Sequence, residues 1–340
     1  MSITIFDVAA LAGCSKSTVS RVFINPTSVP EATRKRVLDA AQELNYTPNV
    51  IARAMVRKKT ENLAFIISSG QYPAVFNPFY SPVLEGVLRT SRKYGYSMLV
   101  MPDNDVYIIN DNKYILKKQM DGVIAAGNID VRLLPELKNL NIPTVLVNNS
   151  EVLDDFYSVS TDHYLGSVKA VEHLIACGYQ KIGLIAGKFS PKITISRYNA
   201  FIETMNNHRI PIDYRYVQSI NATVASAIHC VSEMLTLQEP PEALFCTNDI
   251  IAVGAIKAAN LLHWKVPEDL AIIGFDDSQI CTMMEPEITS IDVDTVTMGT
   301  TATEMLISII NGKKLPQKRV LVPSNLIVRK TTAQKSAINK

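Results

Sequence analysis

The sequence has little of what defines several large classes of protein. It contains one tryptophan and five cysteines in 340 residues, and no apolar run approaches the roughly 18 residues that span a bilayer. Residues 1–13 lack the basic stretch and long apolar segment of a secretory signal. The cysteines are odd in number and without metal-ligand spacing. We therefore expect a cytoplasmic protein that does not contact a membrane, with reduced thiols at Cys14, Cys177, Cys230, Cys246 and Cys281.

Catalytic motifs are also missing. The chain has no G-x-S-x-G elbow, no H-E-x-x-H pair, no phosphate-binding P-loop and no G-x-G-x-x-G after a strand. Its five histidines are spread along helical stretches and loop edges. His163 and His173 have no second ligand at metal spacing, and we expect both to be solvated. The sequence predicts a protein that is not an enzyme and that uses neither a cofactor nor a metal.

Positive charge is concentrated at the start of the chain. Residues 1–60 hold nine Lys or Arg and four Asp or Glu, a net charge of +5, whereas the whole chain carries only +2. The other 280 residues therefore sum to −3. A basic segment on a slightly acidic body is the layout expected when that segment alone contacts a polyanion such as DNA.

The first 48 residues have the pattern of short helices. Thr4 and Asp7 form a capping-box start, Gly13 breaks the first helix, and Ser15 is placed to cap a second one. A third helix is predicted from about 31 to 44. The apolar positions expected to face the core are Val8, Leu11, Ala12, Val19, Val22, Phe23, Val37, Ala41 and Leu44. Two helices joined by a glycine-containing turn are typical of a helix-turn-helix, whose second helix lies in the major groove of DNA.

The second helix carries side chains suited to DNA. Lys16 and Ser17 are predicted to point outward, and Arg21 has the reach to donate two hydrogen bonds to one guanine. Hydroxyl groups suited to phosphate oxygens stand at Ser15, Thr18 and Ser20. The alternative is that these residues cover the surface of an ordinary three-helix unit, with Ser15 serving only as a helix cap.

From residue 61 onward, strands and helices alternate. Apolar runs predict strands at 63–68, 97–101, 122–126, 144–148, 181–187, 243–248 and 270–277. Helical patterns fill the gaps at 81–95, 131–140, 164–177, 195–207, 223–236, 249–263 and 296–311. The alternation predicts two similar α/β lobes, each a doubly wound parallel sheet, facing each other across a cleft. Ligands of such folds bind beyond the carboxyl ends of the strands, where Asn148, Asn248, Asp249, Asp276 and Asp277 fall.

The segment TIFDVAALAGCSKSTVSRV, which starts at Thr4, resembles the head of the lactose-repressor (LacI/GalR) family. The likeness continues in LNYTPN and ARAM, and then in NPFYSPVLEGV, MDGVIAAG, CTNDIIAVGA, VPEDLAIIGFDDS and PEITSIDVD. It implies a small all-α head on a core like that of periplasmic sugar-binding proteins. The implied parts are a DNA-binding domain at 1–48, a hinge helix and linker at 49–60, a two-lobed effector-binding and dimerisation domain at 61–330 and a tail at 331–340. The first lobe would take about 61–160 and 291–320, and the second about 161–290 and 321–330.

The resemblance also assigns DNA contacts residue by residue. Lys16, Ser17 and Arg21 match the positions that select the operator sequence, and 49–56 matches a hinge helix that folds on DNA. Met55 stands where the family has a leucine that wedges into the minor groove. Methionine can wedge in the same way, or it can simply pack against the partner's hinge helix. The full expected set is Thr4, Ser15, Lys16, Ser17, Thr18, Ser20, Arg21, Asn25, Tyr46, Asn49, Ala52, Arg53 and Met55.

The positions that match the family's effector-binding set are Phe79, Asn148, Arg197, Asn248 and Asp276. Amide, carboxylate and guanidinium groups suit a ligand with many hydroxyls. Ordinary structural explanations exist for three of them: Asp276 and Asn248 as helix caps, and Arg197 as a surface ion-pair partner. Asn221 stands where some relatives carry an aromatic residue, so the identity of the ligand stays open.

These features predict a homodimeric repressor of carbohydrate-utilisation genes that binds a pseudo-palindromic operator in double-stranded DNA. A sugar or sugar phosphate in the cleft would act as the effector. The alternatives are a global carbon regulator controlled by a phosphorylated carrier protein, a repressor that needs a purine-type corepressor, and a sugar-binding protein that does not contact DNA.

Replacement of Arg21 by alanine tests base reading. We expect a loss of about 1–3 kcal/mol on the preferred operator and relaxed choice at one base pair. Selection from random duplexes, followed by Kd measurements at one salt concentration, gives both quantities. An equal loss on every sequence would show that Arg21 does not read a base.

Overall fold

A computed structural model of the chain describes residues 3–47, 59–68, 77–103, 119–130, 132–149, 155–188 and 192–335. The chain divides into two compact units. The first comprises residues 1–62 and 114–121, and the second comprises residues 63–113 and 122–340. The expected hinge helix at 49–56 lies outside the described residues.

The first unit contains three short helices around a small apolar core. They are α1 (Ile5–Leu11), α2 (Lys16–Ile24) and α3 (Glu31–Glu43), with a 3-10 turn at Pro26–Ser28 between the last two. The backbone N–H of Thr4 donates to Asp7 Oδ2 at 2.8 Å, and Ser15 Oγ accepts from the Thr18 N–H at 3.1 Å, so both predicted helix starts are confirmed. The inward position predicted at Leu11 is wrong, because that side chain is 47% exposed and Ala9 is buried instead.

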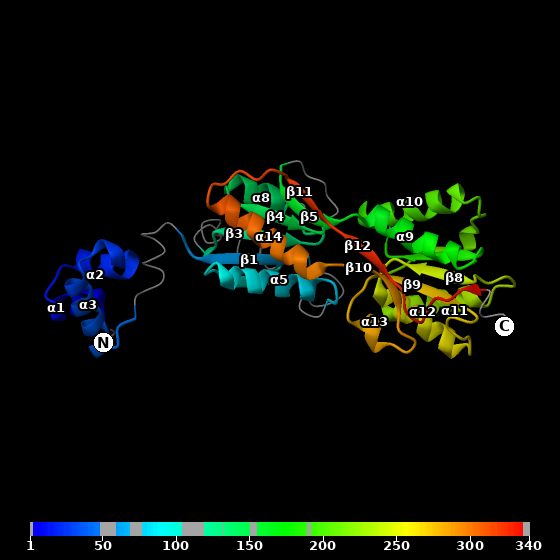
Figure 1. The fold of residues 1–340 in the computed structure, drawn as a ribbon, viewed down its shortest axis with the longest axis horizontal. Helices are drawn as coiled ribbons and strands as arrows, with labels where there is room; N and C mark the ends of the chain where they lie inside the picture. The colour runs from blue at the N-terminus through cyan, green and yellow to red at the C-terminus, as the bar shows by residue number, and fades with distance from the viewer. Residues whose placement is uncertain are drawn as a thin grey trace. The chain divides into compact units, whose positions relative to one another are not determined.

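The first lobe of the second unit is built on a six-stranded sheet with the order β11-β5-β4-β3-β1-β2. Strands β11, β5, β4, β3 and β1 pair in parallel. The strand bounds are β1 (Asn62–Ile67), β2 (Ser97–Pro102), β3 (Gly122–Ala126), β4 (Thr144–Val147), β5 (Tyr157–Thr161) and β11 (Arg319–Val322). Its helices are α5 (Tyr80–Lys93), α8 (Leu133–Asn139) and α14 (Thr295–Ile310). Figure 1 shows α5 and α14 side by side along this sheet.

The second lobe repeats the plan with the order β12-β10-β9-β8-β6-β7. Only β12 runs antiparallel to its neighbour among the described strands of this sheet. The strands are β6 (Ile182–Ala186), β7 (Val217–Ser219), β8 (Ala243–Cys246), β9 (Ala271–Asp276), β10 (Thr289–Val293) and β12 (Ser324–Ile327). The helices are α9 (His163–Ala176), α10 (Lys192–Asn207), α11 (Val224–Leu235), α12 (Asp249–Leu261) and the short α13 (Ile280–Met283). In Figure 1, α9 and α10 cover one face of the sheet and α11 and α12 the other.

The predicted fold class is confirmed, and each predicted strand and helix of the core is present with its ends within three residues. The described chain crosses between the lobes after β5, after β10 and after β11. The crossings differ slightly from the expected lobe boundaries at 291 and 321. Strand β10 stays in the second sheet as far as Val293 and β11 stays in the first as far as Val322, because both strands remain paired up to the crossing.

Two glycines allow α5 and α14 to pack closely. A Cβ atom at Gly299 would lie 2.0 Å from the carbonyl oxygen of Val83, and one at Gly86 would lie 2.2 Å from that of Val296. Neither position has room for a methyl group without moving a helix backbone. The contact therefore depends on the absence of side chains at these two positions.

Replacement of Gly299 by alanine should destabilise the core by about 1–3 kcal/mol through overpacking, despite a helix-propensity gain of about 1 kcal/mol. Urea unfolding measures the change. The control is Glu304→Ala on the exposed side of the same helix, which should stay within about 0.5 kcal/mol. A stabilised Gly299→Ala variant would show that the two helices do not pack this closely.

Candidate functional site

The second helix of the head, α2, presents the predicted base-reading residues to solvent. Lys16, Ser17 and Arg21 are exposed, whereas Val19 and Val22 on the other face are buried. Ser15 caps the helix, and its Oγ also lies 2.7 Å from Ser17 Oγ and 2.9 Å from Thr18 Oγ1. The three hydroxyl groups therefore form one cluster at the start of the helix, where partly charged N–H groups favour a phosphate.

The remaining predicted DNA contacts lie around this helix. Thr4 and Asn25 are exposed, Ser20 and Tyr46 are half-buried, and the Tyr46 ring lies 6.0 Å from that of Phe23. Asn49, Ala52, Arg53 and Met55 fall outside the described residues.

Sequence reasoning missed Phe6 as part of this surface. Its ring is 61% exposed, and Lys16 Nζ lies 4.7 Å from the ring centroid. A cation held over an aromatic face is attracted by the ring quadrupole, so Phe6 restricts where the Lys16 ammonium can go. Its place in the first turn of α1, next to the capping residue Asp7, is the only signal that the sequence offers for this role.

In the second unit, a cavity of about 630 Å³ opens between the two lobes. The five predicted effector residues all line it: Phe79 and Asn148 come from the first lobe, and Arg197, Asn248 and Asp276 come from the second. Four of them stand at strand ends or helix starts, as expected for a doubly wound sheet. The amide side chains of Asn77, Asn128 and Asn221 add to a polar lining.

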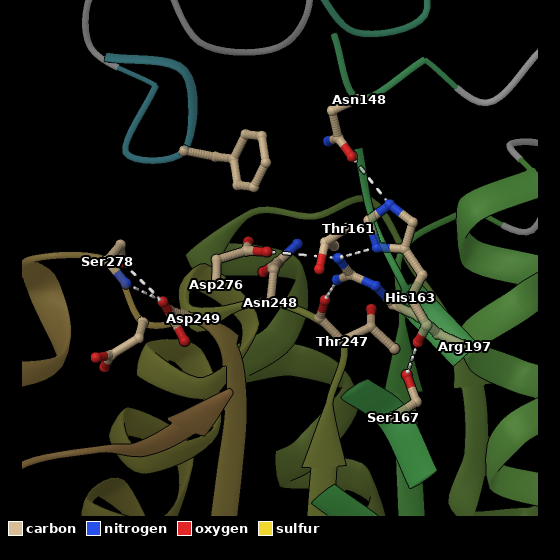
Figure 2. A network of polar contacts seen from close by, with 12 residues as sticks. Asn148, Thr161, His163, Ser167, Arg197, Thr247, Asn248, Asp249, Asp276 and Ser278 are labelled. Carbon is tan, nitrogen blue, oxygen red and sulfur yellow. Dashed lines mark hydrogen bonds and ion pairs between the residues drawn. The ribbon is translucent and has the colours of Figure 1, made fainter. Parts of the chain in front are cut away.

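Arg197, on α10, lies at the centre of the polar network in Figure 2. One terminal nitrogen donates to Asp276 Oδ1 at 3.4 Å and to His163 Nδ1 at 3.1 Å. The other terminal nitrogen donates to the carbonyl oxygen of Thr247. The guanidinium carbon also lies 3.7 Å from the centroid of the Phe275 ring. Arg197 is only 6% exposed, so the alternative of a surface ion pair is wrong.

Asp276 follows the buried part of β9 and turns toward the cavity. Burial raises the pKa of its carboxyl group above the ordinary value, and the positive charge of Arg197 opposes that rise. It does not cap a helix, because α13 begins only at Ile280. The backbone at Asp276 has a φ of +103°, a conformation that a side chain-bearing residue adopts rarely and only where its surroundings hold it.

The loop after Asp276 is fixed by two neighbouring interactions. Arg329 donates to Asp277, with one nitrogen 3.0 Å from Oδ2. Buried Asp249 accepts from the Ser278 N–H at 2.7 Å and from Ser290 Oγ at 2.6 Å. These contacts occupy the carboxylates of Asp249 and Asp277, and Asp276 is the cavity carboxylate that pairs with Arg197.

Asn248 does act as a helix cap, since its Oδ1 accepts from the Ile251 N–H at 2.9 Å at the start of α12. The cap uses the amide oxygen of Asn248 and leaves its amide nitrogen for other partners. The cap therefore also orients the residue in the wall of the cavity.

The prediction that His163 is solvated is wrong. Its side chain is buried, with Nε2 2.9 Å from Asn148 Oδ1 and Nδ1 accepting from Arg197. Burial, followed by the nearby guanidinium charge, lowers the pKa of His163 well below its ordinary value. His173 is half-buried and lies 2.9 Å from Thr332 Oγ1. The position of His163 directly after the cap residue Asp162, at the junction of β5 and α9, was the available signal.

A helix-turn-helix head and two parallel-sheet lobes around a polar cavity define a class of proteins, namely DNA-binding regulators with a periplasmic-binding-protein-like core. Residues 4–49 match the model of bacterial regulatory proteins of the lacI family, and residues 171–332 match the periplasmic binding protein-like domain. No helix of the described residues is long and apolar enough to cross a membrane, and no group of metal-binding side chains occurs among them.

Known regulators are similar to this chain along nearly its whole length. Catabolite control protein A of Priestia megaterium is 30% identical, with 98% of this chain and 100% of that protein covered. The repressor CytR of Escherichia coli K12 is 30% identical, covering 97% and 96%. The structure of the lac repressor dimer bound to operator and the anti-inducer ONPF has a TM-score of 0.84 at 26% identity, covering 98% and 100%. The chain belongs to the lacI family: it is a DNA-binding transcriptional repressor and not an enzyme.

The raised pKa of Asp276 predicts a pH dependence of stability. An unfolded aspartate loses its proton near pH 4, whereas the raised pKa lets the folded one keep its proton to higher pH, so stability should fall as the pH rises above about 4. The Asp276→Asn variant, which keeps an oxygen for Arg197, should show a smaller fall. Urea unfolding from pH 4.5 to 7.5 measures both curves, with Glu233→Gln on the exposed surface as the control. Parallel curves for wild type and Asp276→Asn would contradict the raised pKa.

Proposed function

We propose that this repressor controls carbohydrate-utilisation genes and that a small polyhydroxylated effector in the interlobe cavity sets its affinity for DNA. The observation that carries the proposal is the buried Arg197–Asp276 pair, which faces a cavity lined by amide side chains from both lobes. Carboxylate and amide groups can each bond adjacent hydroxyl groups of a sugar. Phe79, which is buried beside the cavity, offers an apolar surface for a sugar ring.

One similar structure supports the choice of a sugar. The transcriptional regulator CelR in complex with cellobiose has a TM-score of 0.73 and 26% identity, covering 97% of this chain and 100% of that one. A volume of about 630 Å³ lies within the usual range for sites that hold small organic ligands. The cavity therefore suits a mono- or disaccharide.

The mechanism that we propose is a shift between two arrangements of the lobes. A ligand that contacts both Asn148 and Asp276 favours the arrangement in which the two residues are close, and only a difference in affinity between the two arrangements can drive the change. In a cytoplasmic homodimer this shift would alter the spacing of the two heads. The shift would also strengthen or weaken the proposed binding of the hinge segment at 49–56, including Met55, to the operator.

Selection of binding sites from random duplexes at fixed salt, repeated with single compounds, tests this function. The compounds are cellobiose, D-ribose, D-glucose, D-glucose 6-phosphate and hypoxanthine. We expect a palindromic consensus whose affinity changes at least tenfold with a sugar. A response to hypoxanthine alone would indicate a purine-type corepressor instead. A consensus that no compound alters would point to a protein corepressor, and the absence of a consensus would contradict operator recognition.

Replacement of Asp276 by alanine should leave operator affinity within about twofold but reduce the effector response at least tenfold, because a hydrogen bond to a charged group contributes about 1.5–3 kcal/mol and 1.4 kcal/mol is about tenfold in affinity. The same DNA-binding assay measures both. Glu233→Ala, on the exposed surface of the second lobe, is the matched control and should behave as wild type. An unaltered response in Asp276→Ala would place the effector elsewhere.

A further inference from the structure

The imidazole of His163 links the two lobes behind the cavity wall. His163 is the first residue of α9, immediately after the chain crosses from β5 of the first lobe into the second. Its Nε2 lies 2.9 Å from Oδ1 of first-lobe Asn148, and its Nδ1 lies 3.1 Å from a guanidinium nitrogen of second-lobe Arg197 (Figure 2). It therefore contacts two of the cavity-lining residues although it does not line the cavity itself.

The hydrogen bonds fix which nitrogen of His163 carries the proton. A guanidinium group has only donors, so His163 Nδ1 must offer its lone pair to Arg197. A neutral imidazole with an unprotonated Nδ1 carries its proton on Nε2, and this proton is donated to Asn148 Oδ1. An imidazolium would direct an N–H toward the guanidinium, and burial beside a positive charge disfavours it.

The same bonds fix the orientation of the Asn148 amide. Since Oδ1 of Asn148 accepts from His163, its Nδ2 points the other way, where it lies 3.4 Å from the hydroxyl oxygen of Tyr80. Asn148 has a φ of +47° and follows β4 directly, so its backbone is also held in one conformation. The amide group that Asn148 turns away from His163 is thus a donor.

We propose that His163 is a positioning residue that fixes Asn148 as a hydrogen-bond donor and Arg197 as a partner of Asp276, so that the effector must present an acceptor to Asn148 and a hydroxyl donor to Asp276. This rests on the proposed function, and it narrows the effector to ligands with that polarity across the cavity. A ring or glycosidic oxygen of a sugar, together with a nearby hydroxyl group, satisfies both sides.

The start of helix α9 does not depend on the imidazole of His163. The start of α9 is capped by Asp162, whose Oδ1 accepts from the Leu165 N–H at 2.8 Å. The carbonyl oxygen of His163 accepts from Ser167 Oγ at 2.8 Å, which involves only the backbone of His163. A substitution of the side chain therefore leaves the helix start in place.

The protonation state can be read directly from the full-length protein labelled with ¹⁵N-histidine. The resonances of His163 are assigned by their loss in His163→Gln and are recorded at about pH 6, where an ordinary imidazole is largely protonated. We expect a neutral ring with an unprotonated Nδ1 and a protonated Nε2. A charged ring, or a proton on Nδ1, would overturn the proposal whatever the effector is, and would leave the proposed function standing.

Two variants separate positioning from packing. Glutamine can accept from Arg197 and donate to Asn148, whereas leucine of similar volume can do neither. The measurement is the change in operator affinity that cellobiose or D-ribose causes. We expect this change to be at least tenfold smaller in His163→Leu than in the wild type, and to be mostly retained in His163→Gln. Equal losses in two folded variants, judged by thermal unfolding, would assign His163 to packing. If neither these two sugars nor D-glucose and D-glucose 6-phosphate shift operator binding by the wild type, the proposed function fails and the ¹⁵N result alone decides the role of His163.

Discussion

The second unit is organised around a positive charge that is buried between two lobes. A guanidinium group that leaves water loses several kcal/mol of hydration unless hydrogen bonds and an opposite charge replace it. Arg197 obtains these from Asp276, the Thr247 carbonyl group and His163, and its flat face lies against the ring of Phe275. Its Nε atom has no hydrogen-bond partner among the described residues, so even this set leaves one donor unused.

The partners of Arg197 come from separate elements, and this makes the charge a constraint on the whole lobe. Thr247 follows β8, Asp276 ends β9, and His163 begins α9. A shift of any one element would remove a partner from a buried cation, which costs more than the loss of an exposed ion pair. The need to place a carboxylate beside Arg197 also accounts for the strained backbone at Asp276. The Arg329–Asp277 ion pair and the hydrogen bonds to Asp249 hold that backbone in place.

The sequence alone predicted the parts of the fold that have strong local patterns. Strands with continuous apolar side chains, such as β3 and β6, and helices with clear caps were all identified. Strand β5, with the polar sequence YSVST, and strands β7, β10, β11 and β12 were missed, because short strands that depend on their pairing partners leave little local pattern. Leu11 was wrongly predicted to be buried, because helical spacing alone does not show which side of a short helix meets the core.

The site shows the same division. Asn148, Asn248 and Asp276 could be identified because they stand at strand ends, where the topology brings them together. Phe79 and Arg197 were identified by the family resemblance alone. His163 could not, because its partners lie 15 and 34 residues away in sequence, and only the packed lobes put all three side chains in contact. The helix-cap role of Asn248 was equally open until the start of α12 was located. Hydrogen bonds between residues far apart in the chain are therefore the part of the site that is hardest to predict from a single sequence.

The distribution of charge separates the two tasks of the molecule. The first 60 residues carry a net charge of +5 within a chain of +2, so the dependence of DNA binding on salt should arise there. The cavity compensates its own charges, since Arg197 faces Asp276. A neutral effector in such a cavity changes the net charge of the protein very little. If the proposed effector is neutral, its control of DNA binding must therefore pass through geometry, that is, through contacts that exist in one arrangement of the lobes and not in the other.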